Sequence, residues 1–220
     1  GGSLSSNNYN FNFITGKLAI TKAQLKATAE NKTRIYGQEN PEFTVAYTGF
    51  ANGETLFTSG VTGDPVISSS ATPTTPVGEY ALEMANGSLF SGNYDIALEN
   101  GKLNIQKATV SVTVEDKEKV YGEDNPQWTV TYNGFVNAEV LATSGISGSP
   151  DLSSIATKAS GVGVYDILAA TGNLSASNYA FVFAKGKLTI KKALLTITAE
   201  DKSRKYGEAN PSFTASYSGF

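Results

Sequence analysis

Apolar and polar residues alternate along most of the chain, and this alternation predicts β-strands. Residues 110–114 read VSVTV and residues 195–199 read LTITA. Side chains with a period of two lie on one face of a strand, so both runs predict a half-buried strand. Similar runs predict strands around these apolar residues: Trp128, Val130 and Tyr132; Tyr80, Leu82 and Met84; Tyr94, Ile96 and Leu98; Leu103 and Ile105.

Two short segments depart from the strand pattern. Residues 137–143 (NAEVLAT) begin with a good N-cap residue and predict one or two helical turns before Gly145, as does the matching segment 52–58. The Ser- and Thr-rich residues 68–76 predict an exposed loop. The expected fold is therefore all-β or mostly β.

These predicted elements recur at an interval of 85 residues. Equivalent positions are Tyr36, Tyr121 and Tyr206, and the Asn-Tyr pairs at 8–9, 93–94 and 178–179. No insertion or deletion separates them. A unit of this length can bury its own core, because domains begin near ~50 residues. The chain is thus predicted to consist of tandem small domains.

Lys-Ala pairs at 22–23, 107–108 and 192–193 mark the predicted repeat boundaries. The resulting segments are the C-terminal part of a repeat at 1–21, complete repeats at 22–106 and 107–191, and the N-terminal part of a repeat at 192–220. A competing division ends each unit at the Gly-Phe motif, which makes 51–135 and 136–220 complete.

The phase of the alternation changes across a boundary. Apolar residues fall on even positions at Leu18 and Ile20 but on odd positions at Leu25 and Ala27. A strand that changes face in this way enters a different core. Only about four residues separate the two cores, far fewer than a flexible linker uses. We therefore expect a stiff junction and an elongated rod.

Composition excludes several classes of function. The chain has no Cys and no His, so it lacks thiolate nucleophiles, disulfides and the commonest general base and transition-metal ligand. A net charge of −3 with scattered Lys provides no basic patch for nucleic acid. No segment is long and apolar enough to span a membrane. We expect no enzyme activity, no catalytic or metal-binding residue, no cofactor, no nucleic-acid partner and no direct membrane insertion.

A Tyr-Gly pair followed by Asn-Pro appears in every repeat. The motif residues are Tyr36, Gly37, Asn40, Pro41, Tyr121, Gly122, Asn125, Pro126, Tyr206, Gly207, Asn210 and Pro211. Gly accepts a positive φ and Pro fixes its own φ, so the motif predicts a structural turn. We expect the Tyr ring to be buried as an anchor of this turn, with its hydroxyl bound to backbone.

Three motifs in fixed order, K-x-Y-G-x-x-N-P, Y-x-G-F and N-Y…G-K-L-x-I-x-K-A, resemble the YGX-type MBG repeats of bacterial surface proteins. The resemblance covers the whole chain. It implies a β-grasp-like domain within a large secreted, adhesin-like protein at the bacterial cell surface, and it implies no catalytic residue. An immunoglobulin-like β-sandwich is the alternative fold.

Two functions follow as hypotheses. The first is a structural stalk whose repeats contact their neighbours and project a distal binding region from the cell. The alternative is a carbohydrate- or mucin-binding module with a host glycan or protein receptor as its partner, which requires exposed aromatic side chains. Trp128 is the only Trp, but the equivalent residues Phe43 and Phe213 favour a core position.

Other recurring residues have structural and functional interpretations. Glu30, Glu115 and Glu200 suggest Ca²⁺ ligands at the junctions, but a Lys two residues later in each case favours surface ion pairs. Two residue types also recur together, Lys at 22, 107 and 192 and Asn at 8, 93 and 178. Such pairs can form isopeptide crosslinks in surface proteins. We favour the alternative, in which each Lys packs its stem and keeps its charge in water. The two partial repeats leave unpaired strand edges, so we expect head-to-tail contacts between chains.

Overall fold

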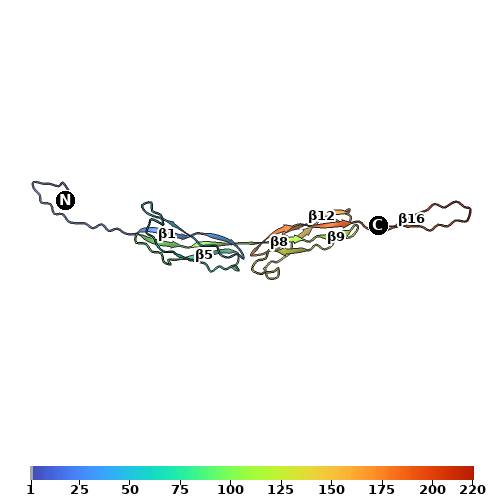
Figure 1. The fold of residues 1–220 in the computed structure, drawn as a ribbon, viewed down its shortest axis with the longest axis horizontal. Helices are drawn as coiled ribbons and strands as arrows, with labels where there is room; N and C mark the ends of the chain where they lie inside the picture. The colour runs from blue at the N-terminus through green and yellow to red at the C-terminus, as the bar shows by residue number, and fades with distance from the viewer. Residues whose placement is uncertain (1) are drawn as a thin grey trace. The chain divides into compact units, whose positions relative to one another are not determined.

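The computed structural model describes residues 2–220, which form sixteen β-strands and no helix (Figure 1). The predicted all-β class is confirmed. Because these residues include no helix, they also include no helix that could cross a membrane.

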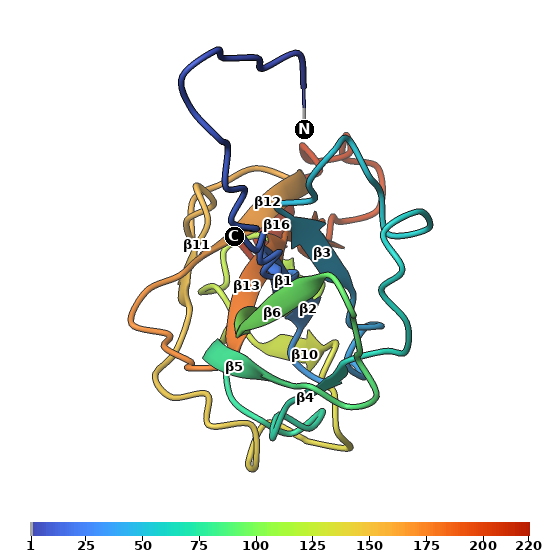
Figure 2. The same ribbon diagram turned by 90° about the vertical axis from the view of Figure 1, so that its left-hand side faces the viewer.

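Each complete repeat contains seven strands arranged in two sheets. The first repeat contains β1 (Ala23–Ala29), β2 (Lys32–Ile35), β3 (Val45–Thr48), β4 (Val66–Ser68), β5 (Gly78–Ala85), β6 (Tyr94–Glu99) and β7 (Gly101–Gln106). Its sheets have the orders β3-β1-β6 and β2-β7-β5-β4. Strands β1 to β6 are labelled in Figure 2.

The second repeat has the same topology. It contains β8 (Ala108–Val114), β9 (Lys117–Val120), β10 (Val130–Asn133), β11 (Asp151–Ser153), β12 (Gly163–Ala170), β13 (Tyr179–Ala184) and β14 (Gly186–Lys191). Its sheets have the orders β10-β8-β13 and β11-β12-β14-β9. Strand for strand these orders match the first repeat, as the constant sequence interval predicts.

Parallel pairing closes each repeat. The opening strand pairs in parallel with the sixth strand, β1 with β6 and β8 with β13. β14 likewise pairs in parallel with β9. The alternation of apolar and polar residues does not predict β2 or β9, whose sequences KTRI and KEKV are rich in charged residues. These short strands lie at sheet edges, where Thr33 and Glu118 are exposed and Arg34 and Lys119 are buried.

The core of the second repeat lies between its two sheets. Val114, Ile167, Leu188 and Ile190 are buried together with Ala156. They come from β8 in one sheet and from β12 and β14 in the other, with Ala156 in a loop. Two sheets that enclose one core form a sandwich-like layer arrangement.

The change of phase at a boundary is visible where β7 leads into β8. β7 buries its odd-numbered residues, such as Leu103 and Ile105, whereas β8 buries even-numbered residues, such as Val110. The two strands belong to different sheets, and only Lys107 lies between them. The chain therefore enters a new core with almost no linker.

The predicted helical turns at 52–58 and 137–143 are wrong, because both segments form hydrogen-bonded turns. Asn52 and Asn137, the expected N-caps, both have φ of 55°. An N-cap residue requires the β region, so these residues cannot start a helix. Only an isolated turn forms, in which the N–H groups of Thr143 and Ser144 both donate to the Val140 carbonyl at 2.9 Å.

The chain divides into two compact units that do not coincide with the sequence repeats. The first unit takes in the chain up to Lys32, Pro41–Ser70 and Tyr80–Leu103. The second unit contains Asn104–Phe220 together with Thr33–Asn40 and Ala71–Glu79. The Tyr-Gly turn of the first repeat therefore belongs to the same compact unit as the whole second repeat.

The partial repeats at the two ends leave their apolar side chains exposed. β15 (Thr196–Ala199) pairs only with β16 (Ala215–Ser218), and every residue of this hairpin is exposed. The apolar residues exposed in the two end segments include Tyr9, Phe11, Phe13, Leu195, Ile197, Phe213 and Tyr217. The repeat boundary itself stays a prediction.

Candidate functional site

Three side chains join the first repeat to the second within the second compact unit. The Tyr36 hydroxyl donates to Glu139 Oε1 at 2.6 Å, and the Tyr179 hydroxyl donates to Glu139 Oε2 at 2.6 Å. Both tyrosines are buried, with exposed fractions of 4% and 1%. Their rings meet edge to face with centroids 5.7 Å apart, a favoured aromatic geometry. We call Tyr36, Glu139 and Tyr179 the tyrosine clasp.

The second repeat positions its half of the clasp through two of its sequence motifs. Tyr179, from the Asn-Tyr motif, starts β13, and its hydroxyl accepts a hydrogen bond from the Val136 N–H at 3.2 Å. Phe135, from the Gly-Phe motif, packs edge to face on Tyr179 with a centroid separation of 5.9 Å. Both motifs therefore fix the position of the Tyr179 ring, against which Tyr36 packs.

Polar contacts surround the clasp. The Val77 N–H donates to Asn178 Oδ1 at 3.1 Å, and Asn137 Nδ2 donates to the Pro73 carbonyl at 3.3 Å. Each bond joins a loop of the first repeat to the second repeat. The junction therefore satisfies backbone groups as well as the two hydroxyls.

The first repeat positions Tyr36 through the Asn-Pro motif. Arg34 is buried, and its Nε donates to Asn40 Oδ1 at 2.8 Å while Nη2 donates to the Thr72 carbonyl at 2.5 Å. Asn40 Nδ2 in turn donates to the Ala71 carbonyl at 2.8 Å. These bonds tie the Tyr-Gly turn to the neighbouring loop, and Pro41 follows directly in the chain.

The second repeat preserves this turn with Lys in place of Arg. Lys119 is buried, and its ammonium donates to the carbonyls of Thr157 at 2.8 Å and Glu123 at 3.0 Å. Asn125 Nδ2 donates to the Ala156 carbonyl at 2.7 Å, and Pro126 follows it. A buried cation and the Asn side chain therefore shape the turn in both repeats.

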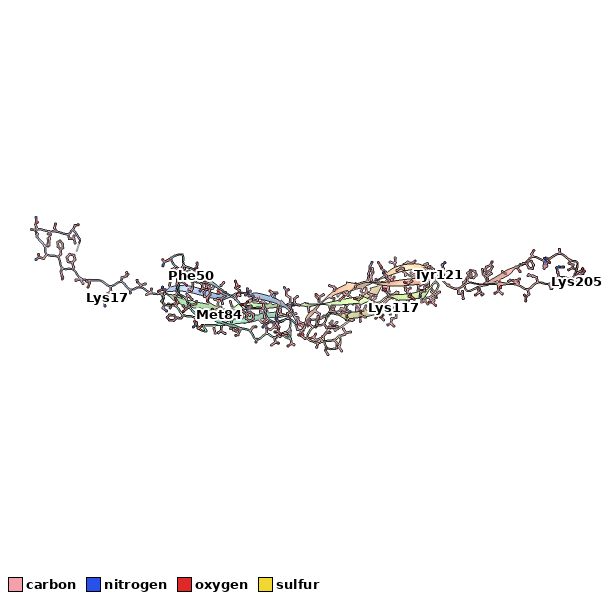
Figure 3. The ribbon with its side chains drawn as sticks, in the orientation of Figure 1. Lys17, Phe50, Met84, Lys117, Tyr121 and Lys205 are labelled. Carbon is pink, nitrogen blue, oxygen red and sulfur yellow. The ribbon has the colours of Figure 1, made fainter. Side chains whose placement is uncertain are left out.

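The equivalent tyrosines show what the next repeat contributes. Tyr121, which is labelled in Figure 3, lies in the second repeat. Its side chain is 49% exposed, and Tyr206 is fully exposed. Beside Tyr121 lies an open cavity of about 560 Å³ lined in part by Val162, Leu195 and Phe220. The expected burial of the motif Tyr thus holds for Tyr36 but not for Tyr121 or Tyr206, and the residues that pack on Tyr36 come from the following repeat. The hydroxyl of Tyr36 also bonds a carboxylate rather than the expected backbone.

Comparison with known families accounts for this arrangement of motifs. The family model for the MBG domain (YGX type) matches residues 25–104, 110–189 and 195–220. The chain belongs to the YGX-type MBG domain family. The three matches start 85 residues apart, like the motifs. No curated protein matches the chain. In this chain, the Tyr-Gly of one MBG repeat contacts the Gly-Phe and Asn-Tyr region of the next.

Sequence analysis found the tyrosines of the clasp but missed its acid. Glu139 and Glu54 are also separated by 85 residues, and each lies two residues after an Asn. In the first MBG repeat the Tyr94 hydroxyl donates to Glu54 Oε2 at 2.5 Å and accepts from the Ala51 N–H at 2.9 Å. This recurring N-x-E spacing was the available signal.

The clasp raises the pKa of both of its tyrosines. Burial, followed by the hydrogen bond to Glu139, raises the pKa of Tyr179 to about 12. The same two causes raise the pKa of Tyr36. Ionisation of either phenol would place a second negative charge beside the Glu139 carboxylate, so the folded junction favours the neutral tyrosines.

We expect the second unit to lose stability in alkaline solution. An unfolded Tyr has a pKa near ~10, below the folded values, so the stabilisation is complete below that pH and is lost as pH rises towards about 12. Urea unfolding at a series of pH values measures this loss. Tyr36→Phe removes one of the two ionisable groups and should reduce the loss. An equal loss in the wild type and this variant would contradict the assignment.

Gly37 and Gly122 provide a matched test of the close approach at the junction. Both have φ of 89°, so both substitutions to Ala carry the same backbone strain. A Cβ at Gly37 would lie 2.5 Å from the Val136 Cβ, whereas a Cβ at Gly122 meets nothing within 4 Å. We expect Gly37→Ala to reduce the free energy of unfolding by about 1–3 kcal/mol more than Gly122→Ala, as overpacking does. Equal effects in urea unfolding would show that the contact is not tight.

Trp128 packs against the core of its MBG repeat. It is partly buried and contacts the cluster formed by Ile167, Leu188 and their neighbours. Phe43 is also partly buried, whereas Phe213 in the partial repeat is exposed. These positions agree with the core interpretation and not with an exposed sugar-stacking platform.

The recurring acids form the predicted surface ion pairs. Lys32, Lys117 and Lys202 lie 3.3, 3.1 and 3.0 Å from Glu30, Glu115 and Glu200 respectively. Each Glu also accepts a hydrogen bond from a Thr side chain, and this bond, followed by the Lys, lowers the pKa of the carboxyl. Asp116 has a backbone partner, because its Oδ1 accepts from the Lys187 N–H at 2.7 Å.

The lysines considered for crosslinks have partners of their own. Lys22 donates to the Ser91 carbonyl at 2.9 Å, and Lys107 donates to the Ala176 carbonyl at 2.8 Å. Both lysines are exposed, and Asn178 already accepts from the Val77 N–H. These contacts favour the solvated lysine over an isopeptide bond, which requires a buried pair.

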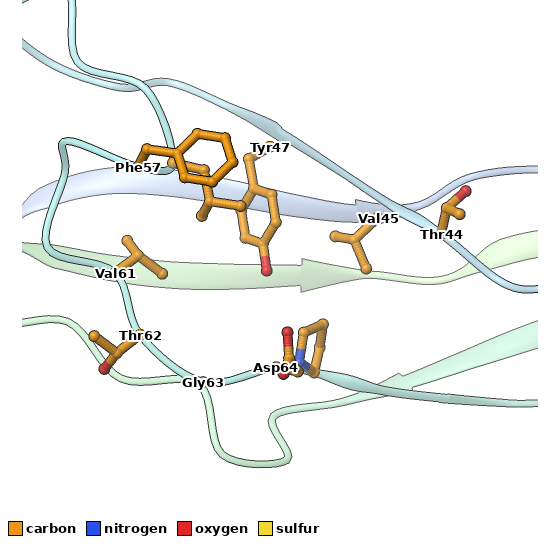
Figure 4. A pocket seen from close by; sticks show the side chains of 10 residues that line it. Thr44, Val45, Tyr47, Phe57, Val61, Thr62, Gly63 and Asp64 are labelled. Carbon is orange, nitrogen blue, oxygen red and sulfur yellow. The ribbon is translucent and has the colours of Figure 1, made fainter.

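The first compact unit carries a groove of about 600 Å³ (Figure 4). Tyr47, Phe57 and Asp64 line it, and Phe57 is 98% exposed. The second MBG repeat has Ala142 and Ser149 at the positions of Phe57 and Asp64. Phe57 and Asp64 are thus particular to one repeat, unlike the residues of the clasp, whereas Tyr47 recurs as Tyr132.

Proposed function

We propose that these MBG repeats are a structural spacer in a bacterial cell-surface adhesin, outside the cell, where they hold a distal binding region away from the surface. The observation that carries the proposal is the tyrosine clasp. The most regular residues of the repeat, Tyr36 and Tyr179, contact each other and Glu139 across a repeat boundary. Their hydrogen bonds and ring contact therefore connect one repeat to the next.

The clasp supports a spacer because it restrains the junction. Lys107 is the only residue between β7 and β8. With so short a connection, one repeat cannot bend relative to the next unless the clasp contacts separate. Bending would expose the buried Tyr36 ring and break its bond to Glu139. Breaking a hydrogen bond to a charged group costs about 1.5–3 kcal/mol, in addition to the apolar area exposed. Because each bend costs free energy, a series of such repeats would resist bending and keep a constant end-to-end length.

Small-angle scattering tests this function. For the wild type we expect an elongated particle with a narrow distribution of bend. The variant Tyr36→Ala should broaden that distribution, while Tyr121→Ala, at the equivalent exposed position, should leave the relation between the two complete repeats unchanged. A compact wild-type particle, or equal flexibility in all three proteins, would overturn the spacer proposal.

Carbohydrate or mucin binding is a second candidate, favoured by the groove beside Phe57. An exposed aromatic ring next to Tyr47 and Asp64 provides a stacking face and a hydrogen-bond acceptor. A glycan array with the wild type and Phe57→Ala tests it. Specific binding that this substitution abolishes supports a binding module, and no binding to any glycan removes the candidate.

A further inference from the structure

The first and last strands of the second repeat run side by side as one long parallel ladder. β8 pairs with β13, beginning with Ala108 opposite Tyr179. β9 pairs with β14, ending with Val120 opposite Lys191. In both pairings the partners are 71 positions apart in the sequence. The two pairings therefore share one register, although β8 and β9 belong to different sheets. We call these four paired strands the terminal ladder.

A side chain continues the terminal ladder where its strands change sheets. Asp116 Oδ1 accepts a hydrogen bond from the Lys187 N–H at 2.7 Å, and these residues are also 71 positions apart. The backbones approach closely here, because a Cβ on Gly186 would lie 2.7 Å from the Val114 carbonyl oxygen. Hydrogen bonds thus connect the first and last strands along their whole length.

The first repeat has the same features. Ala23 lies opposite Tyr94 where β1 pairs in parallel with β6, and β2 lies beside β7 in the other sheet. Asn31 Oδ1 accepts from the Lys102 N–H at 2.8 Å, again across 71 positions. Gly101 precedes this donor as Gly186 precedes Lys187. The terminal ladder is therefore a property of the repeat and not of one copy.

The chain enters the second repeat at one end of the terminal ladder and leaves it at the other. Lys107 directly precedes Ala108 at the first pair, and Lys192 directly follows Lys191 at the last pair. Tension along the chain therefore pulls β8 and β9 towards their N-terminal ends, and β13 and β14 towards their C-terminal ends. Parallel strands pulled in opposite senses must slide past each other, so their hydrogen bonds carry the load together.

We infer that each complete repeat bears tensile load through its terminal ladder. The rate of unfolding governs how long a domain survives under force. One net hydrogen bond changes such a rate by roughly fivefold, so a step that breaks several bonds together is slower than one that breaks a single bond. Peeling the same strands apart from one end would break the bonds one pair at a time. The repeat therefore resists tension along the chain better than it resists peeling.

Stretching single molecules at constant force tests this dependence on direction. The chain has no Cys, so handles can be attached at introduced thiols in the full chain. The pair Lys107→Cys and Lys192→Cys loads the terminal ladder in shear. The pair Lys107→Cys and Ser177→Cys holds both strands at the same end, since Ser177 lies two residues before Tyr179, and peels them apart. All three substituted residues are exposed, so urea unfolding should show equal stability for the two variants.

At the same force, we expect the sheared variant to unfold at least about tenfold more slowly than the peeled variant, because two or more bonds must break in one step. Equal rates, or faster unfolding in shear, would overturn the inference. The spacer proposal would remain in that case, since it concerns bending between repeats, which small-angle scattering measures.

Asp116→Ala tests whether the side-chain bridge carries load. Loss of this one hydrogen bond should speed unfolding in shear about fivefold. The effect should be smaller in the peeled variant, because peeling begins at Ala108 and reaches Asp116 only later. Asp124→Ala is the matched control, since Asp124 is an exposed acid outside the terminal ladder, and it should change neither rate. An equal acceleration in both directions, or none in shear, would contradict the load-bearing role.

Discussion

Tyr36→Ala is expected to reduce the free energy of unfolding of the second compact unit by about 3 kcal/mol, the scale for truncation of a buried aromatic side chain. The substitution removes a ring that packs on Tyr179 and one of the two hydroxyls bound to Glu139. Urea unfolding monitored by the fluorescence of Trp128, which lies in the same unit, measures the change.

Tyr121→Ala is the control for this result. Tyr121 lies in the equivalent Tyr-Gly turn, also followed by Asn-Pro, but it is half exposed and has no Glu139 counterpart as a partner. Its truncation should cost less than about 0.5 kcal/mol, as surface substitutions do. Similar losses at the two positions would mean that Tyr36 stabilises its own turn and not the junction.

Trp128→Ala is expected to cost about 3 kcal/mol, near the lower end for large aromatic residues because the side chain is only partly buried. It packs against the core cluster that includes Ile167 and Leu188, so its loss leaves a cavity beside the core. Circular dichroism during urea unfolding replaces fluorescence, since this is the only Trp.

Phe213→Ala gives the matched comparison for Trp128. Phe213 holds the equivalent position in the C-terminal partial repeat, where it is 77% exposed. We expect a change below about 0.5 kcal/mol in the same measurement. A small loss at Trp128 combined with reduced glycan affinity would instead favour the binding module.

Much of the fold was predictable from local patterns. The alternation in VSVTV and the recurrence of Tyr-Gly predicted the strands and the repeated domain, because both signals lie within a few adjacent residues. The short strand β9 was missed, since its KEKV sequence is mostly charged and its pairing with β14 joins residues about 70 positions apart. Parallel pairing of this kind leaves no turn signature in the sequence.

The candidate site was predictable only in part. Tyr36 was recognisable as a motif residue, but its partner Glu139 is 103 positions away in another repeat. No local rule connects them. The helical turn expected near Glu139 failed because Asn137 and Ala138 both have positive φ, which short-range propensity did not indicate. That same backbone conformation precedes Glu139 in the loop that meets Tyr36.

A double-mutant cycle tests the central claim that Tyr36 and Glu139 join consecutive MBG repeats. The cycle measures the free energy of unfolding for the wild type, Tyr36→Phe, Glu139→Ala and the double variant, and it isolates the pair from the bond between Glu139 and Tyr179. We predict a coupling of about 1–2 kcal/mol between Tyr36 and Glu139, as for a hydrogen bond to a charged group. The parallel cycle with Tyr121→Phe should give none. A coupling between Tyr36 and Glu139 within about 0.3 kcal/mol of zero would contradict the account.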